Sequence, residues 1–87
     1  MKIRDGFVLR EVAGQSIVIA VGGAAEKFNG IIKLNESCAL LWKKLEVGAT
    51  EEELVDTLLS EYEVDEKQAK EDVSAFVESL TKANLIK

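Results

Sequence analysis

The side chains that could carry out chemistry by themselves are few in this chain, and their spacing does not assemble a catalytic set. The 87 residues include one cysteine, Cys38, and no histidine. A Cys–His or Ser–His pair therefore cannot form, and metal sites built from histidines or from a cluster of thiolates are excluded as well. We expect no catalytic residue, no metal site and no cofactor, and we predict that the chain is not an enzyme.

The remaining reactive groups are better explained by structure than by chemistry. Glu51, Glu52 and Glu53 stand together where a helix is predicted to begin, and acids there suit the positive end of the helix dipole. Gly22-Gly23 is followed by Ala-Ala-Glu-Lys, without the lysine and hydroxyl of a phosphate-binding loop. Cys38 falls in the first turn of a helix, where the pKa of a thiol can fall, but no base stands beside it. It is expected to be a small residue at the edge of the core.

Composition limits the partners. The sequence is 47% hydrophobic and 31% charged, which fits a single soluble domain over residues 1–87. The net charge of -5 is uneven, because residues 1–34 carry five basic and three acidic side chains and residues 35–87 carry six and thirteen. A nucleic-acid binder normally has a basic surface, so the acidic half weighs against DNA or RNA. No signal peptide and no membrane-spanning run is found, and we expect a cytoplasmic protein without membrane contact.

The first third of the chain is predicted to form strands. Residues 7–12 and 16–21 are rich in β-forming side chains, and Ala13-Gly14-Gln15 between them is typical of a hairpin turn. Residues 22–29 are predicted to be a loop, which Asn29-Gly30 closes with turn chemistry. A third strand is predicted over residues 30–34.

The rest of the chain is predicted to be helical. Three helices are expected, over residues 35–46, 50–62 and 65–82. Asn35 is a suitable N-cap for the first of them. Thr50 and Glu53 have the spacing of a capping box, and Asp65 and Gln68 repeat this spacing at the start of the third helix.

These elements predict an α+β fold, a winged helix-turn-helix with a three-stranded antiparallel sheet followed by three helices. Their order places the third strand at an edge of the sheet, beside the third helix. Because strand side chains alternate, Ile32 faces the core and Ile31 faces away. We expect a groove lined by Ile31, Val73 and Val77 that accepts the apolar side chains of a bound strand.

Several short motifs, in this order and spacing, resemble the PqqD family, whose namesake is pyrroloquinoline quinone biosynthesis protein D. The segments that carry the resemblance are residues 8–12 (VLREV), 34–42 (LNESCALLW), 48–54 (GATEEEL), 58–64 (LLSEYEV) and 72–76 (DVSAF). Domains of this family are peptide binders, also called RiPP recognition elements. The resemblance implies a single PqqD-like domain over residues 1–87 that binds the leader of a ribosomally made precursor peptide. It would present that precursor to a modifying enzyme, often a radical SAM protein.

The resemblance also implies which residues bind the peptide. The leader would add as a strand beside the third strand and lie against the third helix, a mode called β-augmentation. The implied contacts are Gly30, Ile31, Ile32, Lys33 and Leu34 through the backbone, and Lys70, Asp72, Val73 and Val77 on the helix.

One other function stays open at this point, and a second is rejected. A winged helix DNA-binding transcriptional regulator would share the architecture but would need a basic third helix. An acyl-carrier-like protein would share the small size and acidity, but the chain has no Asp-Ser-Leu attachment site. A homodimer is also an open alternative, through an outer sheet face predicted to hold Val8, Val12, Val18 and Ala20.

Overall fold

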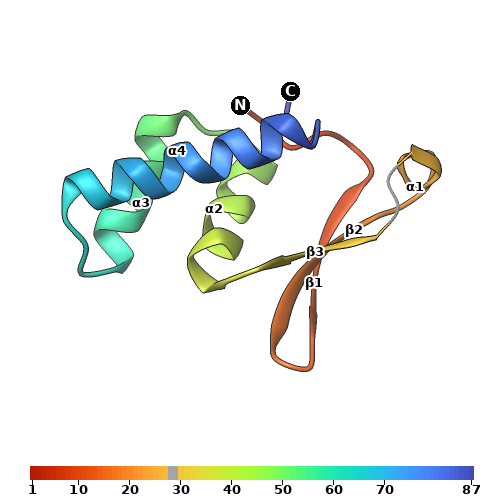
Figure 1. Ribbon diagram of the computed structural model, residues 1–87, viewed down its shortest axis with the longest axis horizontal. Coiled ribbons are helices and arrows are strands. Elements are labelled where there is room, and N and C mark those ends of the chain that lie inside the picture. Colours follow the sequence, from red (N-terminus) through yellow and green to blue (C-terminus); the bar gives the residue numbers. More distant parts are fainter. Residues whose placement is uncertain (28–29) are drawn as a thin grey trace.

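A three-stranded sheet at one end of the molecule joins a bundle of helices at the other end (Figure 1). The computed structural model describes residues 1–27 and 30–87. The predicted turn at Asn29-Gly30 therefore lies partly outside the described residues. In chain order the elements are β1 (Phe7–Val12), β2 (Gln15–Ala20), α1 (Ala24–Lys27), β3 (Ile31–Leu34), α2 (Glu36–Val47), α3 (Glu51–Glu61) and α4 (Glu66–Lys82).

The predicted α+β architecture is confirmed, with small shifts in the elements. The prediction of an uninterrupted loop over residues 22–29 is wrong, because the four-residue helix α1 forms within it. The hairpin turn has two residues, Ala13 and Gly14, with φ angles of 51° and 77°. Positive φ at both positions matches the twist of a β-hairpin, so Gln15 already pairs with Val12 and β2 begins one residue earlier than predicted.

The pairing register decides which side chains of the sheet face the helices. The strand order is β1-β2-β3 and both pairings are antiparallel. Leu9, Val18 and Ile32 are aligned across the three strands, and Val18 is fully buried. They form the inner face. Ala20 is two residues from Val18 in the same strand, so its side chain faces the same side of the sheet. The prediction that Val18 and Ala20 lie on the outer face is therefore wrong.

The outer face instead presents the alternate residues of each strand. Val8, Ile19 and Ile31 form one row across the sheet, and Arg10, Ile17 and Lys33 form the next. Val12, at the hairpin end of β1, continues this face and is 56% exposed.

The helices begin where their capping residues predict. The Asn35 side chain accepts from the Cys38 amide at 2.8 Å, and Thr50 and Glu53 form both bonds of the capping box. The third cap differs from its prediction. Asp65 accepts from the Gln68 amide, but the Gln68 side chain donates to Asp72 one turn further on instead of returning the bond.

The two ends of the chain tie α4 to the sheet. Ile3 and Ile86 form an isolated antiparallel bridge, and the Arg4 amide donates to the Leu85 carbonyl at 2.8 Å. The termini accordingly lie close together (Figure 1). Trp42 of α2 and Leu85 are fully buried, so the segment after α4 is part of the core. This packing fixes the position of α4 relative to the strands.

In the part of the chain that the structure describes, no helix combines the length and apolarity needed to cross a bilayer.

Candidate functional site

The outermost strand, β3, has one side without a backbone partner. It pairs with β2 alone in the sheet of the described residues, and no backbone bond outside that pairing involves Ile31–Leu34 there. Alternate residues of an antiparallel strand direct their N–H and C=O groups to opposite sides. In two of the four residues of β3, the backbone N–H and C=O groups therefore point away from β2 and are not used in the sheet. Such an unpaired edge is a template for another strand.

The side chains of β3 alternate as predicted. Ile32 and Leu34 are partly buried and pack against the core. Ile31 is 54% exposed and Lys33 is exposed as well. Gly30, immediately before the strand, has a φ of 116° and is exposed.

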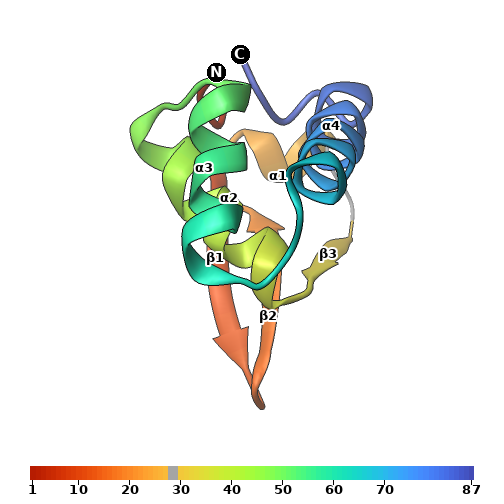
Figure 2. The same ribbon diagram turned by 90° about the vertical axis from the view of Figure 1, so that its left-hand side faces the viewer.

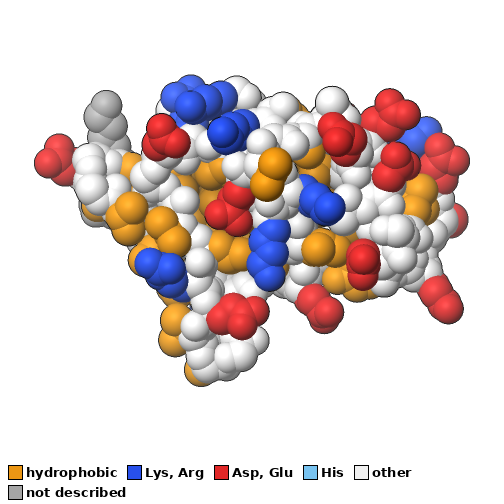
Figure 3. Space-filling model, turned by 180° about the vertical axis from the view of Figure 1, so that it is seen from behind, with side chains coloured by type: hydrophobic (Ala, Val, Ile, Leu, Met, Phe, Trp, Pro, Cys, Tyr) orange, Lys and Arg blue, Asp and Glu red, His pale blue; other side chains and the backbone are white. Residues whose placement is uncertain are grey.

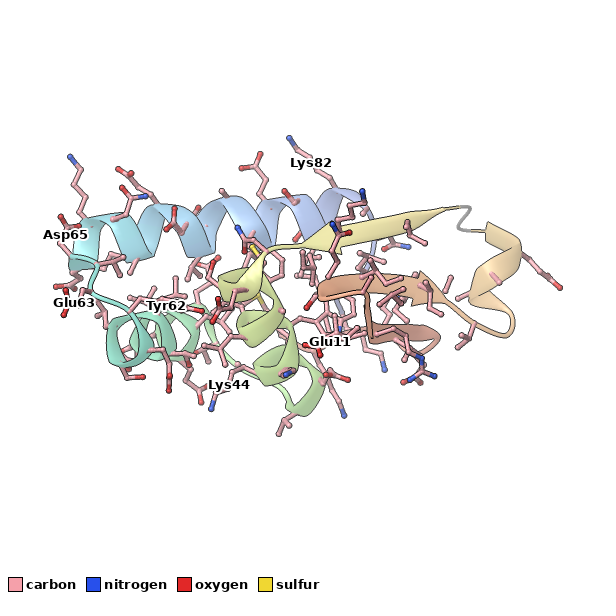
Figure 4. The ribbon with its side chains drawn as sticks, turned by 90° about the horizontal axis from the view of Figure 1, so that it is seen from below. Glu11, Lys44, Tyr62, Glu63, Asp65 and Lys82 are labelled. Carbon is pink, nitrogen blue, oxygen red and sulfur yellow. The ribbon has the colours of Figure 1, made fainter. Side chains whose placement is uncertain are left out.

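Helix α4 runs beside β3 on the same side of the molecule, as two perpendicular views agree (Figures 2 and 4). Asp72 identifies the flank of α4 that faces β3, because it shares a pocket with Asn35 and Ser37 at the point where β3 passes into α2. Ser79 is exposed and lies seven residues beyond Asp72, almost two helical turns, and so on the same flank. We call the open edge of β3 together with this flank the β3–α4 surface.

A pocket of about 320 Å³ lies at one end of the β3–α4 surface, and we call it the end pocket. Its apolar lining comes from Leu58, Tyr62 and Val64, and its polar lining from Asn35, Glu36, Ser37 and Asp72. Desolvation and the carboxylates of Glu36 and Glu61 raise the pKa of Tyr62. The pocket is large enough for a side chain and offers it both apolar and polar contacts.

Cys38 follows Ser37 of this pocket in the chain and is partly buried. Burial raises the pKa of its thiol, the Asp72 carboxylate raises it further, and a hydrogen bond with Ser37 opposes both effects. The thiolate is thus disfavoured, which agrees with the structural role expected from the sequence. In the described residues, no group of three or more Cys, Asp or Glu side chains is placed to hold a metal ion.

Three of the four predicted helix contacts lie on a different flank of α4 from Asp72. Lys70 and Val73 line a different pocket, between α3 and α4, together with Glu51 and Glu52. Val73 is 1% exposed, so it belongs to the core.

Val77 is the third of these contacts, and it is 8% exposed within the core cluster. It lies seven residues beyond Lys70 and so on that residue's flank. Val73 and Val77 are therefore too buried to form an open groove with Ile31, and the end pocket places Asp72 near the end of β3. The contact of the four helix residues with a peptide stays a prediction. The helical periodicity showed which residues of α4 are buried, but not which neighbour each flank of the helix meets.

Charge is distributed unevenly over the molecule. Seen from behind, acidic side chains gather at the helical end, whereas hydrophobic side chains are visible around the sheet (Figure 3). The outer face of the three strands carries two cations, Arg10 and Lys33, and no anion. The outer face of the sheet is therefore less acidic than the helical end, although Lys33 and Leu34 also line a pocket that includes Glu11, Glu36 and Glu61.

Comparison with known proteins identifies the family. The family model described as Coenzyme PQQ synthesis protein D (PqqD) matches residues 7–86, nearly the whole chain. The chain belongs to the PqqD family. A comparison of sequences finds no match among curated proteins.

Two solved structures share the fold of this PqqD-family chain. One is described as "TbiB1 in Complex with the TbiA(beta) Leader Peptide", with a TM-score of 0.79 and 25% identity, covering 100% of this chain and 95% of the other. The second, "Lasso peptide synthetase B1 complexed with the leader peptide", has a TM-score of 0.75 and 23% identity and covers 97% and 93%. At this identity the second likeness concerns the fold alone.

Proposed function

We propose that this PqqD-family chain is a non-catalytic adaptor that captures the leader of a ribosomally synthesised precursor peptide by β-strand addition. It presents the precursor to a modifying enzyme, with a radical SAM enzyme as the expected partner, and acts in the cytoplasm. The observation that carries the proposal is the open edge of β3 beside α4, in a fold whose solved relatives include complexes with leader peptides.

The β3–α4 surface offers enough contacts for useful affinity. Two residues of β3 with free backbone groups give up to about four hydrogen bonds, each worth roughly 1 kcal/mol net. Two apolar side chains, one in the end pocket and one beside Ile32, add about 1.5 kcal/mol each. Together these contributions place the expected dissociation constant in the micromolar range.

DNA binding is not supported by the charges on α4. Its basic residues are Lys67, Lys70 and Lys82. Lys70 is paired with Glu66 and Lys82 with Glu78, both at 3.0 Å. A helix whose lysines are largely balanced by its own carboxylates provides little of the phosphate neutralisation that DNA affinity requires.

The proposal is tested by isothermal titration calorimetry with the short peptides encoded beside the gene of this chain. We expect one of them to bind with micromolar affinity, with a stoichiometry of about one. Two-dimensional amide NMR spectra should show the largest changes at Ile31–Leu34 and around Asp72. Absence of binding by every such peptide, or changes confined to β1 or to the pocket between α3 and α4, would contradict the proposal.

A further inference from the structure

The outer face of β3 presents two different side chains to any strand that joins its edge. Ile31 ends the apolar row of Val8 and Ile19, and Lys33 ends the row of Arg10 and Ile17. A strand added at this edge places one residue beside Ile31 and one beside Lys33, whether the peptide runs parallel or antiparallel to β3. Residues that face each other across two strands are about 5 Å apart at Cβ and interact directly.

In the residues that the structure describes, Lys33 forms no ion pair, although it lines an open pocket together with Glu11, Glu36 and Glu61. The ion pairs found in the described residues are those of Lys70 and Lys82, both within α4. No acid lies on the outer face of the strands, since Glu11 has the parity of the inner face. The exposed ammonium group of Lys33 is therefore within reach of a carboxylate on the outer face of a neighbouring strand.

The opposite side of the peptide meets a different environment. Its inward side chains face the helices, where Asp72 and Glu36 line the end pocket. A carboxylate there would meet like charge, whereas a carboxylate on the outer face would meet Lys33. The two faces of the bound strand thus have opposite charge preferences, and an acidic residue is directed to the outer one.

We infer that the bound peptide carries an aspartate or glutamate beside Lys33 and an apolar residue two positions away beside Ile31. The inference rests on the proposed function, because it assumes that the peptide adds at β3. Lys33 is then a residue that determines specificity, and the ligand is an acidic segment with an apolar side chain on the same face. An opposed ion pair at such a position changes affinity by about two- to fivefold relative to a neutral pair.

A display library of random 15-residue peptides tests the inference without knowledge of the natural precursor. The library is selected on the wild-type protein, on Lys33→Glu and, as the matched control, on Arg10→Glu. Arg10 lies in the same row and on the same face as Lys33, but on the opposite edge of the sheet, about 10 Å away across two strand spacings. Circular dichroism establishes that the variants, which change exposed side chains, remain folded.

We expect the wild-type protein and Arg10→Glu to enrich peptides with an acid two positions from an apolar residue. Lys33→Glu should enrich lysine or arginine at the acidic position. In fluorescence anisotropy, reversing that peptide charge should weaken binding to the wild-type protein by roughly three- to tenfold and strengthen binding to Lys33→Glu.

The outcomes separate the inference from the proposed function. Enrichment of peptides with the same preference on the wild-type protein and on Lys33→Glu would overturn the inference and leave peptide capture intact. A change from acidic to basic peptides on Arg10→Glu, and not on Lys33→Glu, would overturn the inference and indicate that the peptide binds at the β1 edge. Failure to enrich any peptide on any of the three proteins would count against peptide capture itself, and the inference would fall with it.

Discussion

A tryptophan placed on the flank of α4 that faces β3 should block peptide binding without unfolding the protein. The change is Ser79→Trp, and the matched control is Ser74→Trp on the same helix. Both serines are exposed, and Ser74 lines the pocket between α3 and α4. Five residues separate them, about 140° around the helix axis. Serine and tryptophan have similar helix propensities, so both variants should be within about 0.5 kcal/mol of the wild-type stability.

The expected loss follows from the spacing of strands. A peptide paired with β3 lies about 4.8 Å from it, on the side where α4 runs (Figures 2 and 4). An indole ring at position 79 would occupy part of that space and displace the peptide along about half of the strand. Loss of two of the four backbone bonds costs about 2 kcal/mol, which corresponds to roughly 30-fold weaker binding.

Fluorescence anisotropy with a labelled peptide, selected by calorimetry, measures the two dissociation constants, and urea denaturation measures the two stabilities. Ser74→Trp should bind within about twofold of the wild type, since exposed substitutions away from a site have small effects. An unchanged dissociation constant for Ser79→Trp would refute the placement of the peptide between β3 and α4. A loss for Ser74→Trp alone would move the site to the pocket between α3 and α4.

The other predictions concern the backbone, the thiol and the fold. Methylation of successive amide nitrogens in the bound peptide should weaken binding at every second residue, by about fivefold each, and a scan without this period of two would exclude strand addition. Cys38 should react with iodoacetamide more slowly than free cysteine at the same pH, because burial and Asp72 raise its pKa, and Asp72→Asn should accelerate the reaction in a pH–rate profile. The raised pKa of Cys38 also makes the free energy of unfolding depend on pH. The stabilisation is present below the pKa of the thiol in the unfolded state and is lost as the pH rises through its pKa in the folded state. Urea denaturation at several pH values, with Cys38→Ala as the control, detects this loss. Thr50→Ala removes one bond of the capping box and should cost about 1 kcal/mol of stability in urea denaturation, with peptide affinity unchanged.

Features set by local chemistry could be predicted from the sequence. Asn35 and Thr50 begin their helices because their side chains satisfy nearby backbone amides, and that depends on residues at most three positions away. The buried stripe of α2, including Trp42 and Leu45, follows from helical periodicity alone. The edge position of β3 followed from the order of the elements, and its inner and outer side chains followed from simple alternation.

Features set by contacts between distant segments could not be predicted in this way. Periodicity assigns Val77 to a position near the core of α4, but whether that flank meets α3 or β3 depends on how the helix crosses the bundle. This crossing depends on the packing of α4 against α3 and on the bridge between Ile3 and Ile86, which joins the two ends of the chain. The predicted faces of Val18 and Ala20 are wrong because the register of β1 and β2 depends on a two-residue turn. A shift of the register by one residue moves every side chain of a strand to the other face of the sheet. The end pocket combines residues from α2, α3 and α4, and no local signal in the sequence marks it.

Strands β1 and β3 are the two outer strands of the sheet, and the difference between them explains why a peptide should choose β3. Both edges carry a cation on the outer face, Arg10 on β1 and Lys33 on β3, and a charge on an edge strand opposes pairing between copies of the same protein. If the β3 edges of two copies were paired antiparallel, their lysines would lie close together, which is unfavourable, whereas an acidic peptide would meet opposite charge. Helix α4 accompanies β3, so a strand added there gains contacts with α4 in addition to backbone bonds. The same lysine can therefore disfavour self-association and favour an acidic guest, which lets an unpaired edge remain available for a specific peptide.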